Sequence, residues 1–119
     1  MKKSACPVKL FQEVQTNVQL YHWLTDSYAK HKASDQLYAD LQKSIDRYME
    51  VFIGKYGRPT DVNTSLAVKR MTDQELNAYL KEVVKHLQGC VASCDSDLGS
   101  IRDDILANIH QALYLFTLK

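Results

Sequence analysis

The sequence predicts an all-α protein, a four-helix bundle with one long connection between the second and third helices. Apolar residues recur at spacings of three and four in four separate segments, and no two-residue alternation typical of a strand persists anywhere. Only four glycines and two prolines occur, and they fall where these segments would begin or end. Since 119 residues suffice for one domain with a usable core, we expect residues 1–119 to form a single domain.

The first two helices are predicted on either side of a short break. The first runs from about residue 7 to Trp23 or Leu24, and Ser27 in the break is a favourable capping residue. The second begins near residue 28 and stops at KYGRP. There Gly57 can take the left-handed conformation after the last turn, and Pro59 prevents continuation.

A polar connector is predicted over residues 58–71, with a short turn around Ser65–Lys69. The TDQE sequence that follows is a capping box, in which Thr72 and Glu75 each bond the other's main-chain N–H. After CDSDLGS the chain turns into the last helix. The apolar repeats of the third and fourth helices are Leu76, Tyr79, Leu80, Val83, Val84 and Leu87, then Ile101, Ile105, Leu106, Ile109, Leu113 and Phe116.

Composition argues against several classes of partner. The chain has 15 basic and 14 acidic residues, a net charge of +1, so we expect neither nucleic acid nor an anionic membrane surface as a partner. No apolar run approaches the roughly 20 residues of a membrane span, and no signal-peptide pattern follows the N-terminal MKK. We interpret Cys6, Cys90 and Cys94 as reduced thiols of a cytoplasmic protein.

Four polar residues of the second helix carry the candidate chemistry. Taking His31 as zero at about 100° per residue, Asp35 lies near 40°, Asp46 near 60° and Glu50 near 100°. All four share one stripe, but His31 and Asp46 are about 22 Å apart along the axis at about 1.5 Å per residue. One chain therefore does not gather them around one ion.

A second copy of the helix, lying antiparallel across the stripe, would solve this problem. His31 and Asp35 of one chain would then face Asp46 and Glu50 of the other, and a two-fold dimer would have two identical sites. His22 can join such a site only if the chain reverses between Leu24 and residue 28, because on a continuous helix it would point to the opposite side. We therefore predict a homodimer at minimum.

Imidazole and carboxylate ligands with open positions suit Fe(II), and carboxylates stabilise the higher charge after oxidation. Without cysteine ligands the set does not fit a closed structural zinc site. The same spacings are also frequent on solvated helix faces that carry ordinary structural histidines, so this alternative stays open. We expect Trp23 and the tyrosines Tyr21, Tyr28, Tyr38 and Tyr48 mainly to pack, although such side chains can also pass or quench oxidising equivalents.

These residues resemble the motif of the Dps-like miniferritins of the ferritin superfamily. The family's His-Trp pair matches His22–Trp23, its H-x-x-x-D matches His31 to Asp35, and its D-x-x-x-E matches Asp46 to Glu50, with the fifteen-residue step from His31 to Asp46 kept. The tail LYLFTLK is similar to the family's last helix. The segments HWLTDSYAKHKASD and GKYGR are more similar still to small uncharacterised ferritin-like proteins of large DNA viruses and phages.

The resemblance implies a ferritin-like bundle that oxidises Fe(II) with hydrogen peroxide or dioxygen at a dimer interface, for iron detoxification or storage in a larger shell. His22 and His31 would supply neutral nitrogens, and Glu50 a bridging or bidentate carboxylate. Asp35 and Asp46 would neutralise charge. The location implied is the host cytoplasm, or the virion of a virus.

One alternative function and one further candidate stripe remain. The chain can instead be a non-catalytic structural or interaction protein on the same bundle, for example a virion or capsid-associated component, since fold does not fix function. A second stripe on the third helix contains His86, Cys90 and Cys94, but its spacing matches no usual zinc pattern, and we expect it to be structural, as we do His110.

Overall fold

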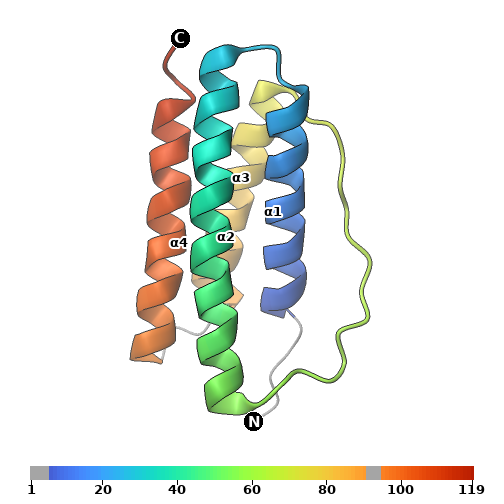
Figure 1. The fold of residues 1–119 in the computed structure, drawn as a ribbon, viewed down its shortest axis with the longest axis vertical. Coiled ribbons are helices and arrows are strands. Elements are labelled where there is room, and N and C mark those ends of the chain that lie inside the picture. The colour runs from blue at the N-terminus through green and yellow to red at the C-terminus, as the bar shows by residue number, and fades with distance from the viewer. Residues whose placement is uncertain (1–5, 91–94) are drawn as a thin grey trace.

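A computed structural model, which describes residues 6–90 and 95–119, contains four helices and no strand within those ranges. In Figure 1, α1 and α4 run in one direction while α2 and α3 run in the other. A connector, residues 57–72, returns from the end of α2 to the start of α3 along the outside of α1. The helices are α1 (Cys6–Leu24), α2 (Tyr28–Tyr56), α3 (Asp73–Cys90) and α4 (Ser96–Leu115).

The four helices form a square in which α2 packs against α1 and α4, and α3 packs against the same two helices. In the described part of the chain, the backbones of the diagonal pairs, α1 with α4 and α2 with α3, do not approach each other closely. A bundle with one long crossover is the topology of ferritin-like folds. The predicted all-α bundle with its crossover is therefore confirmed.

Each helix supplies one buried apolar stripe to a common core, as the three-and-four spacing predicts. On α2 the buried apolar residues follow one another every three or four positions, on a different face from the polar stripe, whose three carboxylates are exposed. The core residues buried most completely are Phe11, Val14, Val18, Leu37, Leu41, Tyr48, Leu76, Leu80, Leu87, Leu98, Ile105 and Ile109.

The break between α1 and α2 spans three residues, and Ser27 caps α2 by accepting a hydrogen bond from the Lys30 N–H at 3.2 Å. At the other end of α2, Gly57 donates its N–H to the Ile53 carbonyl at 2.8 Å. Its φ of 87° is positive as expected, but its ψ of 168° lies outside the left-handed helical region. The chain therefore leaves α2 in an extended direction, toward the crossover.

The predicted turn around Ser65–Lys69 is wrong, because no helical turn forms there. Two main-chain N–H groups of this segment are bonded to α1 instead: Ala67 N–H donates to Glu13 Oε2 at 2.9 Å, and Lys69 N–H donates to Asn17 Oδ1 at 3.1 Å. Asn17 Nδ2 also donates to the Ala67 carbonyl at 3.0 Å. These two side chains fasten the end of the connector to the bundle.

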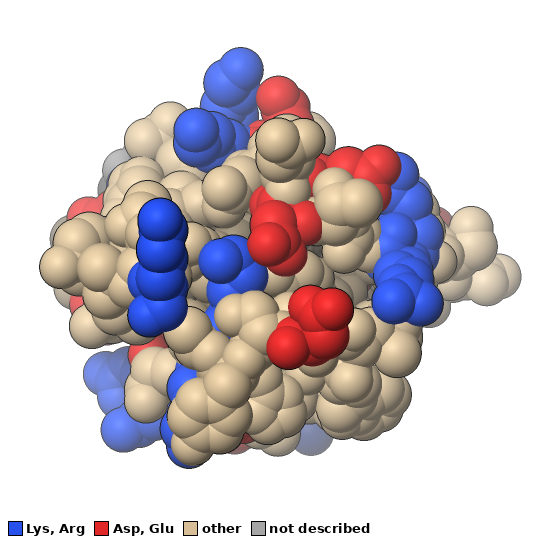
Figure 2. Space-filling view, turned by 90° about the horizontal axis from the view of Figure 1, so that it is seen from above, with Lys and Arg blue, Asp and Glu red and all other residues tan. Residues whose placement is uncertain are grey.

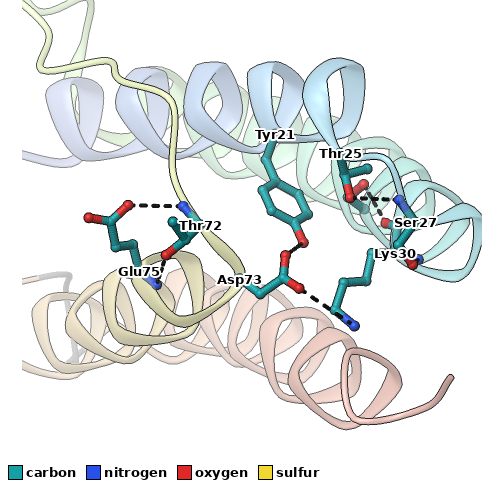
Figure 3. Close-up of polar contacts among 8 residues, drawn as sticks. Tyr21, Thr25, Ser27, Lys30, Thr72, Asp73 and Glu75 are labelled. Carbon is teal, nitrogen blue, oxygen red and sulfur yellow. Dashed lines mark hydrogen bonds and ion pairs between the residues drawn. The ribbon is translucent and has the colours of Figure 1, made fainter.

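The capping box of α3 is confirmed. Thr72 N–H donates to Glu75 Oε1 at 2.9 Å, and Glu75 N–H donates to Thr72 Oγ1 at 3.2 Å (Figure 3).

Of the second stripe, on α3, His86 is exposed. The Cys90 side chain and Cys94 lie outside the described residues, as does the Cys6 side chain. His110 is an exposed residue of α4. No helix in the described part of the chain is long and apolar enough to cross a membrane.

Candidate metal centre

His22 and His31 meet across the α1–α2 break. The His22 Nδ1 lies 2.9 Å from the His31 carbonyl oxygen, and the His31 Nδ1 lies 3.0 Å from the His22 carbonyl oxygen. The two rings stack with centroids 4.0 Å apart and planes 19° apart. The chain reversal that His22 requires is therefore present, and the pairing itself helps to hold the ends of the two helices together.

This pairing fixes which ring nitrogens carry protons. A carbonyl oxygen only accepts, so both Nδ1 atoms must donate. In the neutral rings, both Nε2 atoms are then left with a lone pair. Donation of one ring N–H to a main-chain carbonyl while the other nitrogen is available is the arrangement of metal-ligating histidines. In their neutral forms both histidines thus have the protonation that a metal-ligating imidazole needs.

Asp35 is the carboxylate nearest to this pair. Its Oδ1 lies 3.9 Å from His22 Nε2, and its side chain is mostly exposed. Asp46 lies farther along α2, where it lines a hollow of about 440 Å³ between α1 and α2, and Glu50 is exposed one turn beyond it. The structure thus brings His22, His31 and Asp35 together and leaves Asp46 and Glu50 on a distant part of the same helix.

One chain does not complete a metal site from its described residues: residues 6–90 and 95–119 contain no group of three or more His, Cys, Asp or Glu side chains placed to hold an ion. Asp46 and Glu50 of the same chain stay far from His31, because α2 is continuous from Tyr28 to Tyr56. Completing the predicted set requires ligands from a second chain.

A polar network near the same end of the bundle had no signal in the sequence. Tyr21, buried on α1, donates its phenol O–H to Asp73 Oδ1 at 2.5 Å, and Lys30 Nζ lies 3.9 Å from Asp73 Oδ2 (Figure 3). Burial, and then the hydrogen bond to the Asp73 carboxylate, raise the pKa of the Tyr21 phenol above its ordinary value. The network joins α1, α2 and α3, and only the folded chain brings together residues so far apart in the sequence.

The aromatic side chains divide into two groups. Tyr21 and Tyr48 are buried in the core, and Tyr38 packs partly buried against it, as expected. The expectation of packing is wrong for Trp23 and Tyr28, which are 63% and 75% exposed beside the histidine pair. Trp23 lies in the last turn of α1 and Tyr28 is the first residue of α2, so both flank the three-residue break between the two helices.

Figure 2 looks onto this end of the bundle. Acidic side chains lie near its centre, and lysine or arginine side chains flank them on both sides. No broad field of one sign covers this face, consistent with the net charge of +1. Any cation bound at the histidine pair, at this end of the bundle, would therefore be held by local ligands rather than by the charge of the whole face.

Comparisons with known proteins place this chain in a family. Residues 22–116 match the model of DUF5856, described as a family of unknown function. A protein of enterobacteria phage T4, described as an uncharacterized 14.6 kDa protein in the mobD–ri intergenic region, is 30% identical over 122 aligned positions, which cover 92% of this chain and 84% of the phage protein. No solved structure matches the chain. The matched region contains all five predicted ligands and all or part of every helix, and the chain therefore belongs to the DUF5856 family.

Proposed function

We propose that two copies of this chain bind Fe(II) between antiparallel α2 helices and oxidise it with hydrogen peroxide or dioxygen. The observation that carries the proposal is the histidine pair, whose Nδ1 groups are both bonded to carbonyls so that both Nε2 atoms are available as ligands. The resemblance of residues 22–50 to the miniferritin motif supports the same activity.

The spacing along α2 supports a two-fold arrangement. His31 and Glu50 are equally far from the midpoint between residues 40 and 41, and Asp35 and Asp46 are equally far from it as well. A two-fold axis at this midpoint, perpendicular to α2, would set His31 opposite Glu50 and Asp35 opposite Asp46 in the two chains. A single two-fold axis thus places both pairs of predicted ligands opposite each other.

The surface near this midpoint suits contact between identical copies. Ala39 and Gln42 are exposed and uncharged, and the small side chain of Ala39 lets two helices approach closely. Gln42 borders the hollow between α1 and α2, which also holds Gln12, Gln15 and Gln19. Because an amide both donates and accepts hydrogen bonds, a surface rich in amides can pair with a copy of itself.

The ligands of such a centre have separate tasks. His22 and His31 would bind as neutral nitrogens, so the positive charge of the substrate ion would be balanced by Asp35, Asp46 and Glu50. Two facing aspartates repel each other without a cation between them, so the site would favour metal-loaded chains. When two Fe(II) ions react with one peroxide, each loses one electron, the O–O bond breaks and two hydroxide ions form.

The wider setting is part of the proposal. A dimer is the minimum assembly, a shell of dimers would store the oxidised iron, and the T4 relative supports a location in the host cytoplasm or the virion. We propose no role for nucleic acid, because a net charge of +1 offers few phosphate contacts.

The test is an iron-oxidation assay. Fe(II) is added anaerobically to the protein, air or peroxide is admitted, and ferric absorbance is followed. We expect rapid oxidation at about one or two irons per chain by the native protein and its loss in the Asp46→Ala, Glu50→Ala double variant.

A matched control replaces two exposed carboxylates elsewhere, Glu82 on α3 and Asp104 on α4, with alanine. This variant should oxidise iron like the native protein. Equally slow oxidation by all three proteins would contradict the ferroxidase proposal and favour the non-catalytic structural bundle instead.

A further inference from the structure

We propose that the exposed Tyr28 of one copy docks against Ile53 and Gly54 of a second copy, at both ends of the antiparallel α2 pair. This contact rests on the dimer of the proposed function, and it extends the dimer interface to residues that bind no metal. Its occupant is a second copy because both halves of the contact lie on one helix, at symmetric distances from the proposed axis.

The first observation is the exposed aromatic surface at the α1–α2 turn. Tyr28 is 75% exposed, Trp23 63% and Leu24 42%, and the Tyr28 ring lies 6.4 Å from the His31 ring, centroid to centroid. Neighbouring exposed aromatic side chains are typical of the buried centre of a protein–protein contact. This surface adjoins the candidate metal centre, so it continues the proposed interface.

The second observation is Gly54, in the last turns of α2. A Cβ added there would meet no atom within 4 Å, and its φ is not positive, since Gly57 is the only residue with positive φ in the described part of the chain. Neither packing nor backbone conformation within the chain requires a glycine at position 54. A glycine inside a helix also makes it less stable than alanine would. Its lack of a side chain leaves a flat spot beside the half-buried Ile53.

Symmetry joins these two observations. About the midpoint between residues 40 and 41, the position equivalent to Tyr28 is Ile53, and Gly54 is the next residue. Around the helix, Tyr28 lies near 60° and Ile53 near 40° from His31, within the stripe, while Gly54 lies near 140°, just beyond it. The Tyr28 ring of one copy would thus rest on Ile53 and extend over the flat surface at Gly54.

The experiment measures the dimer dissociation constant by sedimentation equilibrium, with and without Fe(II) under anaerobic conditions. Gly54→Gln should raise it by about tenfold or more, because the new side chain occupies the place of the ring. Gly89→Gln is the matched control: Gly89 is a helical glycine of α3 whose added Cβ also meets nothing within 4 Å, and this change should leave the constant unaltered. Circular dichroism should show the native helix content for both.

A second pair of variants tests the ring itself. Tyr28→Ser should weaken the dimer as Gly54→Gln does, and Tyr114→Ser, which alters another exposed tyrosine, on α4, should not. Combining Tyr28→Ser with Gly54→Gln should weaken the dimer less than the product of the two single effects, because both remove the same contact.

The outcomes separate the contact from the iron chemistry. A native dimer that neither Gly54→Gln nor Tyr28→Ser weakens overturns the docking proposal and leaves the ferroxidase proposal standing. A native protein that stays monomeric with and without Fe(II) overturns both. A dimer that both variants weaken, in a protein that oxidises iron slowly, supports the docking contact and contradicts the ferroxidase proposal.

Discussion

Replacing Asn17 with alanine tests whether the crossover is fastened to the bundle as the structure indicates. The Asn17 side chain is 1% exposed and makes three hydrogen bonds, to the Ala67 carbonyl, the Lys69 N–H and the Tyr79 hydroxyl at 3.0, 3.1 and 3.2 Å. A net value of about 1 kcal/mol per bond gives an upper figure of about 3 kcal/mol. Ala67 and Lys69 are exposed, so in the variant water can replace some of these hydrogen bonds. We therefore expect the free energy of unfolding to fall by about 2 kcal/mol.

The loss is large enough to measure by thermal unfolding. With an unfolding entropy of about 2.1 cal/mol/K per residue over 119 residues, about 2 kcal/mol corresponds to a fall of about 8 °C in Tm. Circular dichroism at the helical band gives Tm, and urea titration gives the free energy of unfolding. Amide hydrogen exchange at Lys69 should also become faster, because its acceptor is gone.

Asn63→Ala, an exposed position on the same connector, provides the control and should change the free energy of unfolding by less than about 0.5 kcal/mol. The reasoning would be refuted if Asn17→Ala were as stable as this control. The connector would then owe its path to something other than the Asn17 bonds.

Two further predictions concern the helix ends. Thr72→Ala removes the capping-box acceptor at the start of α3 and should cost about 1 kcal/mol in urea unfolding, whereas Thr72→Ser should keep most of that stability; equal losses in both would contradict a capping role. At the other end of the bundle, the Lys55 ammonium, as a hydrogen-bond donor 2.8 Å away, lowers the pKa of Asp97. Since the folded-state pKa lies below the unfolded value of about 3.9, its stabilisation is present above that pH and disappears as the pH falls through the folded pKa. Asp97→Asn should therefore lower the free energy of unfolding more at pH 6 than at pH 2, and a loss of the same size at both values would show that the charge is not responsible.

The fold was predictable because local patterns and packing agree in this chain. The repeats of three and four placed the buried stripes, and Ser27, Thr72 and Gly57 marked helix ends by chemistry that acts within a few residues. The connector was harder to predict, because its conformation depends on bonds from Glu13 and Asn17, more than fifty residues earlier in the sequence. Local propensity does not encode such contacts.

For the candidate site, helix spacing predicted only how the proposed ligands are arranged within one chain, and their role as ligands stays a prediction. Helical geometry placed His31, Asp35, Asp46 and Glu50 on one stripe and required a reversal of the chain to bring His22 to it, and the reversal is present. The mutual Nδ1–carbonyl bonds of the two histidines and the Tyr21–Asp73 contact depend on the exact approach of different helices. Spacing along one helix contains no information about these contacts, so only the folded chain reveals them.

The central claim is that each iron centre is shared between two chains, and complementation tests it most directly. One variant carries His31→Ala and Asp35→Ala, and the other carries Asp46→Ala and Glu50→Ala, so a dimer of either alone has no intact site. In a mixed dimer, one of the two sites would have all its ligands intact. If chains exchange at random, half of the dimers are mixed, and about a quarter of the native Fe(II) oxidation rate should return on mixing. A mixture that stays as slow as either variant alone, with chain exchange verified by native mass spectrometry, would contradict a site shared between antiparallel α2 helices.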